Sequence, residues 1–259
     1  MTAAPRIASL VPSATETLVA LGLAPWLVAR TGFCIHPAER LAEVPKVGGT
    51  KDVNITKLRR LAPTHVVLNV DENRRETADA LREFVPQLIV THPQCPQDNL
   101  ALLEQLRAAF TGLPGVDERA AELSGQLRQA LAACRAAPRH PRRVLYLIWR
   151  QPWMTVARDT YLSRLLAEAG WQTWPDATGG PSGAARYPVL SGTEPWLAEV
   201  DEVLLSSEPY RFGPEHLAEA QALCPQARVR LVDGELLSWW GVRAIPGLGY
   251  LQQLTAATA

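Results

Sequence analysis

The segment Trp149–Met154, with the sequence WRQPWM, combines two tryptophans with an arginine and a methionine. It follows Val144–Ile148, an apolar run that we interpret as a buried strand. In open α/β sheets, ligands bind at the carboxyl ends of the strands, which is where these side chains would lie. Large flat rings beside a fixed cation suit a flat, partly anionic ligand. Trp149, Arg150 and Trp153 are therefore candidate ligand-binding residues.

A second segment repeats this chemistry after the predicted strand Arg228–Val232. It contains Trp239, Trp240 and Arg243. Tryptophan is highly buried on average, so each ring taken alone is more simply explained as part of the core. Two clusters of the same composition at equivalent strand ends favour a binding role for both.

Polar and aromatic side chains also follow the predicted strand Glu202–Leu205. Tyr210 could stack on a ligand and Glu208 could orient Arg150 or Arg243, although packing explains these two residues equally well. Arginine makes paired hydrogen bonds to carboxylate, amide oxygen or phosphate. The alternative for both arginines is a salt bridge at the surface or between lobes.

The first third of the chain contributes Cys34, His36 and Asn73 as candidate ligand-binding residues. Neutral imidazole ligates cobalt, iron or zinc, and thiolate favours softer metals, so His36 is the candidate metal ligand. The alternatives are a surface hydrogen bond for His36 and a small buried side chain for Cys34. Asn73 follows the predicted strand His65–Val70, where it is expected to cap a helix through Phe84 and to touch a ligand.

Strands alternate with helices in the first and last thirds, which predicts parallel sheets with right-handed crossovers. Two helical stretches, Asp98–Phe110 and Val116–Ala136, lie between them without an intervening strand. The fold class is therefore α/β, with two Rossmann-like lobes joined by a long helical backbone. The expected division is residues 1–95, 96–140 and 141–259.

Local signals refine this outline. Ser13–Glu16 matches a capping box, in which Ser13 would precede a helix that ends near Gly22. Glu194–Glu199 and Pro214–Leu223 are predicted as helices. A last helix is expected from about Pro246.

The composition excludes several classes of function. Twenty-six basic and 26 acidic residues give a net charge of zero, which argues against a nonspecific nucleic-acid binder. No apolar run approaches the roughly 20 residues of a membrane-spanning helix, so membrane insertion is not expected. Because no signal-peptide pattern opens the chain, we expect a cytoplasmic protein as written, or a periplasmic one if a signal peptide has been removed.

No phosphate-binding loop, dinucleotide fingerprint or catalytic motif is present, which predicts neither a nucleotide cofactor nor an enzyme.

The chain resembles the helical-backbone substrate-binding proteins (cluster A, class III) throughout its length. The match is closer to a branch of cobalamin-binding proteins related to the periplasmic vitamin B12-binding protein. The segments that carry the resemblance are Arg6–Glu16, Val47–Thr50, Leu58–Val66, Tyr146–Met154, Ser206–Tyr210 and Val232–Glu235.

This resemblance implies a corrinoid or similar metal chelate held in a cleft between the lobes, and an ABC-transporter permease as a partner. It aligns His36 with a tyrosine that packs on the corrin in vitamin B12-binding members. Their corrin-enclosing tryptophan aligns with Thr50, and their transporter-docking glutamate aligns with Arg75. The alternatives are a metal-ion or haem receptor, or a cytoplasmic corrinoid-handling enzyme or chaperone on the same fold.

Overall fold

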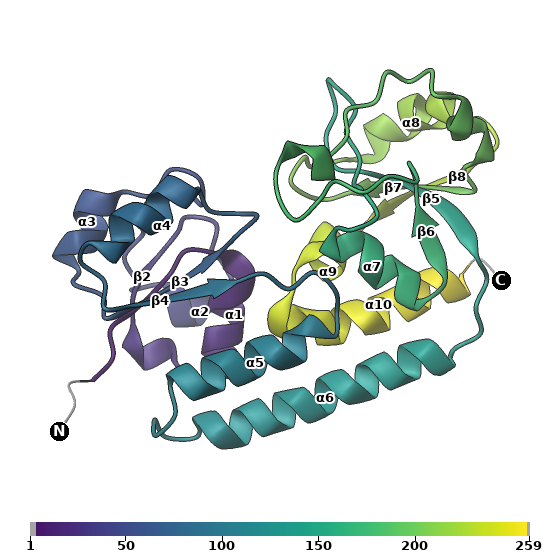
Figure 1. Cartoon of the computed structure of the whole chain (residues 1–259). Helices are drawn as coiled ribbons and strands as arrows, with labels where there is room; N and C mark the ends of the chain where they lie inside the picture. The colour runs from purple at the N-terminus through teal and green to yellow at the C-terminus, as the bar shows by residue number, and fades with distance from the viewer. Residues whose placement is uncertain (1–3, 258–259) are drawn as a thin grey trace. The chain divides into compact units, whose positions relative to one another are not determined.

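The computed structural model describes residues 4–257, which form two compact α/β units (Figure 1). Unit 1 comprises the chain up to Pro93, Asp98–Leu127 and Trp240–Arg243. Unit 2 comprises Gln94–Gln97, Arg128–Trp239 and the chain from Ala244 onward. Each unit contains a four-stranded parallel sheet with helices, which confirms the predicted fold class.

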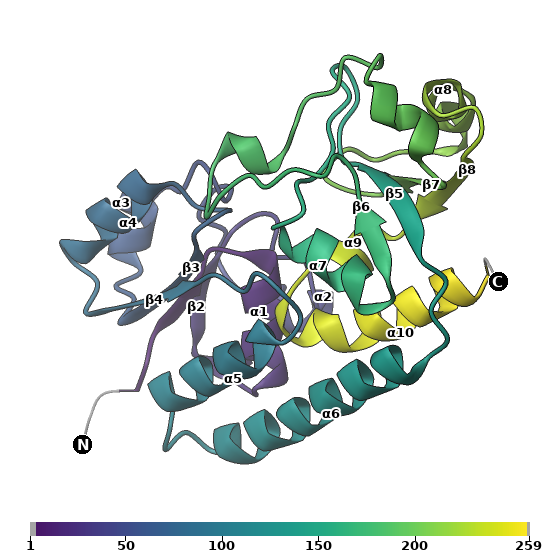
Figure 2. The same ribbon diagram turned by 45° about the vertical axis from the view of Figure 1, so that its right-hand side comes forward.

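The sheet of unit 1 has the strand order β2-β1-β3-β4, and all its strand pairs are parallel. In both views (Figure 1 and Figure 2), α3 and α4 lie on one face of this sheet and α1 lies on the other. The strands are β1 (Ile7–Ser9), β2 (Leu27–Arg30), β3 (His65–Asn69) and β4 (Gln87–Thr91). The helices are α1 (Pro12–Ala20), α2 (Ala38–Leu41), α3 (Ile55–Arg60), α4 (Arg75–Arg82), α5 (Asp98–Ala109) and the 3-10 turns η1 (Ala24–Trp26) and η5 (Gly241–Arg243).

The sheet of unit 2 has the order β6-β5-β7-β8, again with parallel pairs throughout. Helix α8 lies on one face of it, and α7, α9 and α10 lie on the other (Figure 2). The strands are β5 (Arg142–Leu147), β6 (Trp171–Thr173), β7 (Glu202–Ser206) and β8 (Arg228–Val232). The helices are α7 (Tyr161–Glu168), α8 (Leu217–Leu223), α9 (Gly234–Ser238), α10 (Ala244–Ala256) and the 3-10 turns η2 (Ala184–Arg186), η3 (Pro195–Glu199) and η4 (Pro214–His216).

Helix α6 (Val116–Ala136) has 21 residues and is about 30 Å long at 1.5 Å per residue. It begins in unit 1 and ends in unit 2, as the predicted helical backbone requires. The boundary between the two units falls within α6, between Leu127 and Arg128. The three-part division at residues 95 and 140 stays a prediction.

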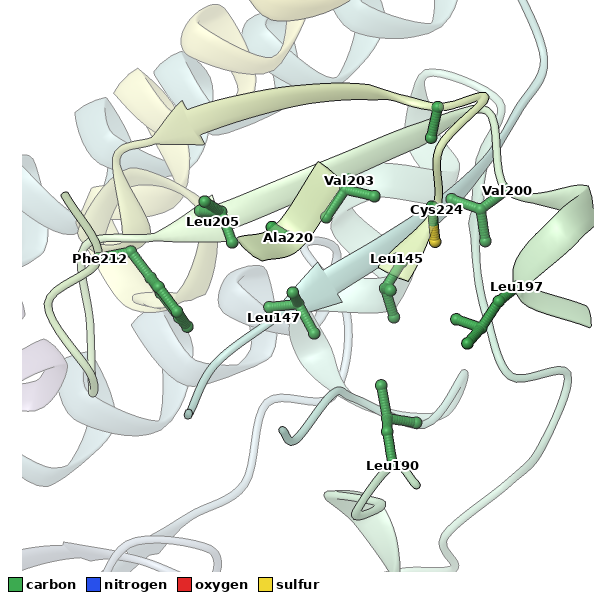
Figure 3. Packing of buried hydrophobic residues seen from close by; sticks show 11 residues of the cluster. Leu145, Leu147, Leu190, Leu197, Val200, Val203, Leu205, Phe212, Ala220 and Cys224 are labelled. Atoms are coloured by element: carbon green, nitrogen blue, oxygen red, sulfur yellow. The ribbon is translucent and has the colours of Figure 1, made fainter. Parts of the chain in front are cut away.

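The core of unit 2 packs between the sheet and α8 (Figure 3). β5 and β7 contribute continuous buried apolar runs, as expected for parallel strands covered on both faces. The partly buried rings of Trp153 and Tyr210 pack against this cluster. The candidate site residues of unit 2 therefore rest on a rigid core. The cluster consists of Leu145, Leu147, Leu190, Leu197, Val200, Val203, Leu205, Phe212, Ala220, Cys224 and Ala227.

Two local predictions are wrong. Helix α1 begins at Pro12 instead of after Ser13, because proline at the first helical position needs no hydrogen-bonded N–H and already has a helical φ. The side chain of Thr15, and not that of Ser13, stabilises this turn by donating to the Val11 carbonyl at 2.9 Å. The segment predicted as a helix at Glu194–Glu199 is the 3-10 turn η3, which starts at Pro195.

Candidate functional site

The loop Trp149–Met154 follows β5 and folds back on itself. Ile148 N donates to the Met154 carbonyl at 2.9 Å, and Met154 N donates to the Trp149 carbonyl at 3.1 Å. Gln151 makes the reversal in the left-handed region, with φ 60°. The backbone of Leu190 adds a bond to the Trp153 carbonyl at 2.8 Å. The loop is therefore held at both ends and presents its side chains in a fixed arrangement.

The loop after β7 brings a second group of rings to the same sheet edge, because β5 and β7 are parallel neighbours. Trp149 and Tyr210 meet edge to face with ring centroids 5.6 Å apart. Trp153 stacks on Phe212 at 5.9 Å, with an interplanar angle of 6°. Trp149 is 41% exposed, so its ring offers apolar surface to a ligand. The structure thus brings together three of the candidate ligand-binding residues, Trp149, Trp153 and Tyr210.

Arg150 is paired within this unit. Its Nε donates to Glu219 Oε2 on α8 at 2.7 Å. The Glu219 carboxylate, and then the Tyr210 hydroxyl, raise the pKa of Arg150. The guanidinium charge at the aromatic cluster is consequently balanced by a carboxylate.

Trp239 is placed differently from this cluster. It is 8% exposed, and its indole Nε1 donates to Glu208 Oε1 at 2.7 Å. Ser238 Oγ donates to the same oxygen at 2.6 Å. Burial raises the pKa of Glu208, while these two hydrogen bonds oppose that rise. Glu208 therefore holds the start of the segment after α9, and the prediction that it orients Arg150 or Arg243 is wrong.

The residues that follow belong to unit 1, where η5 packs on α1 and α5. Gly241 N donates to Asn99 Oδ1 at 2.6 Å, and Arg243 Nε donates to Glu16 Oε2 at 2.8 Å. Trp240 is 5% exposed. Trp240 and Arg243 therefore belong to unit 1, where Trp240 is buried and Arg243 is ion-paired.

Cys34 and His36 follow β2 at the carboxyl edge of unit 1. The Cys34 thiol is fully buried, lies 3.1 Å from Thr31 Oγ1 and donates weakly to the Ser9 carbonyl at 3.8 Å. Burial raises its pKa, which disfavours the thiolate that a soft metal would need. Cys34 therefore belongs to the core in this structure, and the expectation that it faces a ligand is not met. His36 is half-buried.

Asn73 bridges three segments of unit 1. Its Oδ1 accepts from Asn69 N at 2.8 Å, and its Nδ2 donates to the carbonyls of Thr50 at 2.9 Å and Leu10 at 3.4 Å. Arg74 occupies the position before α4, so the predicted helix cap at Asn73 is wrong. Asn73 is 6% exposed, and the hydrogen bonds of its side chain join the strand-end loops.

Several residues at these edges were not among the individually predicted ligand-binding residues. Phe33 and Ile35 flank Cys34 and are 62% and 47% exposed, so the loop after β2 carries an apolar surface. Their alternation with a buried cysteine is the signal that could have identified them. His216 and Glu219 contact Tyr210 and Arg150, but lie beyond any local motif.

Two kinds of feature, a metal site and a membrane-spanning helix, are not found among the described residues 4–257. Within that range, no three His, Cys, Asp or Glu side chains come together as a metal site. None of the helices there combines the length and the apolar composition that a membrane crossing requires.

Comparison with known proteins adds a family and a fold. The profile of the periplasmic binding protein family matches residues 7–219. A vitamin B12-binding protein of Pectobacterium atrosepticum is 24% identical over 258 residues, covering 85% of this chain and 88% of its own length. A vitamin B12-binding protein of Yersinia pestis is 27% identical over 248 residues, covering 86% of each chain.

Solved structures resemble the whole chain. The periplasmic vitamin B12 binding protein BtuF of Vibrio cholerae superimposes with a TM-score of 0.79 at 20% identity, covering 98% of this chain and 97% of its own. The periplasmic heme binding protein HutB of Vibrio cholerae gives 0.78 at 23% identity, covering 96% and 98%. At this level of identity the likeness concerns the fold.

Proposed function

Because the chain belongs to the periplasmic binding protein family, we propose that it binds a corrinoid, a metal chelate whose rim carries neutral amides. Members of the family are substrate-binding proteins, and this chain is a binding protein and not an enzyme. The vitamin B12-binding relatives support the choice of ligand class. An ABC-transporter permease is the partner that we propose to receive the ligand.

One observation on this chain supports the corrinoid in particular. The half-exposed aromatic face at Trp149 and Tyr210 adjoins the cation of Arg150, which is already balanced by Glu219 at 2.7 Å. A neutral amide can hydrogen-bond to such a pair without disturbing the charge balance. A carboxylate would be attracted to Arg150 but also repelled by the Glu219 carboxylate beside it.

Haem is the second candidate, because haem-binding proteins share the fold. Its rim carries two propionates, which are best matched by unpaired arginines. Arg243 is also paired, with Glu16 at 2.8 Å. Both predicted arginines thus favour the neutral rim of a corrinoid over the charged rim of haem.

Ligand contacts are proposed for each unit separately. Trp149 and Tyr210 would contact the ring system from unit 2, and Phe33 and Ile35 offer exposed apolar surface in unit 1. His36 is proposed to act at the ligand's metal or to pack on the ring. That the ligand lies between the two lobes stays a prediction.

Fluorescence titration tests the proposal. Cyanocobalamin and dicyanocobinamide at micromolar concentration should quench the tryptophan emission, with free tryptophan as the inner-filter control. Trp149→Leu removes a ring worth about 1–3 kcal/mol and should weaken binding about 5- to 150-fold. Trp196→Leu, which changes a half-buried tryptophan in η3, is the matched control and should leave the affinity unchanged. No quenching by either corrinoid, or equal losses in both variants, would contradict the proposal.

A further inference from the structure

His216 is a buried histidine that lies against the aromatic cluster of unit 2. It is 8% exposed and ends η4. Its ring meets Tyr210 and Phe212 edge to face, with centroids 5.5 Å and 5.4 Å away. Its Nε2 lies 3.2 Å from the Tyr210 hydroxyl oxygen. The buried His216 ring therefore contacts Tyr210, which is a candidate ligand-binding residue.

The hydrogen bonds of His216 fix which nitrogen carries the proton. Gly213 N donates to His216 Nδ1 at 2.9 Å. A backbone N–H can only donate, so Nδ1 must be unprotonated, and the neutral ring carries its proton on Nε2. His216 Nε2 therefore donates to the hydroxyl oxygen of Tyr210.

The bond from His216 decides which way the Tyr210 hydroxyl proton points. Because the phenol oxygen accepts from His216 Nε2, its own proton must point away from His216. That proton is then the group that Tyr210 can offer to a ligand.

We propose that His216 is a positioning residue that makes Tyr210 a directed hydrogen-bond donor toward an acceptor on the ligand rim, such as an amide carbonyl. The proposal rests on the proposed corrinoid-binding function and names the rim group that unit 2 selects.

Isosteric variants separate positioning from packing. In His216→Asn, the amide oxygen can replace Nδ1 as acceptor for Gly213, but no group reaches Tyr210. In His216→Gln, the amide nitrogen can replace Nε2 as donor to Tyr210. We expect dicyanocobinamide binding about 3- to 10-fold weaker in His216→Asn, the effect of one lost hydrogen bond, and closer to wild type in His216→Gln. Equal weakening in both variants would overturn the proposal.

A double-mutant cycle that combines Tyr210→Phe with His216→Asn is a second test of the positioning role. The Tyr210→Phe variant should lose the same factor as His216→Asn and show no further loss when the two changes are combined. Additive losses would mean that His216 acts only through packing.

A ligand-free measurement keeps this inference distinct from the proposed function. Imidazole ¹⁵N shifts of the free protein should report the Nε2–H tautomer for His216, and an Nδ1–H tautomer would overturn the positioning role. If wild-type protein binds no corrinoid although the tautomer is as expected, the ligand assignment fails, and the recognition of a corrinoid amide by Tyr210 fails with it.

Discussion

Each arginine predicted to meet a ligand is already paired with a glutamate. Arg150 contacts Glu219 at 2.7 Å, and Arg243 contacts Glu16 at 2.8 Å. The Arg150–Glu219 pair is partly exposed, and such pairs contribute little to stability. Their effect on ligand choice is larger, because they decide whether the binding face presents a free charge.

Removing the carboxylate at Arg150 should therefore change selectivity. Glu219→Gln keeps an oxygen that accepts from Arg150 but leaves the guanidinium charge unbalanced. We expect the affinity for haemin to rise about two- to fivefold relative to that for dicyanocobinamide. Glu199→Gln is the control, because it breaks a similar ion pair with Arg143 at 2.8 Å near the start of β5. An unchanged ratio of affinities in Glu219→Gln would contradict the charge argument.

His36 supplies a second prediction for a single residue. If its imidazole binds the cobalt of a corrinoid, His36→Ala should weaken binding and change the visible spectrum of the bound aquocobalamin, and His36→Tyr should keep ring contact but lose the metal-bond spectrum. His140→Ala, at another half-buried histidine, serves as the control. Identical spectra and affinities in all four proteins would exclude His36 from the site.

At the scale of elements, Glu208 connects the loop after β7 with the end of α9. It accepts from Ser238 at 2.6 Å and from Trp239 at 2.7 Å. Burial raises its pKa above the ordinary value of 4.5. The folded protein therefore binds a proton at Glu208 over a pH range in which the unfolded chain has lost it.

This linkage has a definite sign. Between the ordinary pKa and the raised one the native state holds more protons, so the contribution of Glu208 to the free energy of unfolding is lost as the pH rises through the folded pKa. The slope can reach about 1.4 kcal/mol per pH unit. Glu208→Gln keeps an amide oxygen for both donors and should remove this part of the slope. Urea unfolding of both proteins across the acidic-to-neutral range measures the difference, and parallel curves would show that Glu208 does not titrate as described.

The elements themselves were largely predictable from the sequence, because strand and helix patterns depend on neighbouring residues. The apolar run before Trp149 predicted β5, and the alanine- and leucine-rich stretch predicted α6. The capping roles of Ser13 and Asn73 were wrong, because Pro12 starts α1 by itself and Asn73 is committed to the backbone of Asn69, Thr50 and Leu10.

The partners of the site residues could not be predicted in the same way. Trp149 meets Tyr210 because β5 and β7 are neighbours in a sheet whose order departs from the chain order. Arg150 reaches a carboxylate 69 positions away on α8, and Arg243 one 227 positions away on α1. Such pairs depend on topology, which no local motif encodes.

At the scale of the whole molecule, two α/β units with a long helix between them form the fold shared with vitamin B12-binding and haem-binding proteins. The fold therefore leaves both ligand classes open. We propose that the side chains at the strand ends decide between them, because the ring of Trp149 is exposed and Arg150 is already paired with Glu219.

Competition between the two ligand classes on the wild-type protein tests this account most directly. Calorimetric titration with dicyanocobinamide, and separately with haemin, should give one corrinoid per chain with the higher affinity, and haemin should fail to displace a bound corrinoid at equal concentration. Tighter binding of haemin, or no binding of the corrinoid, would contradict the proposal that the paired arginines select a neutral-rimmed ligand.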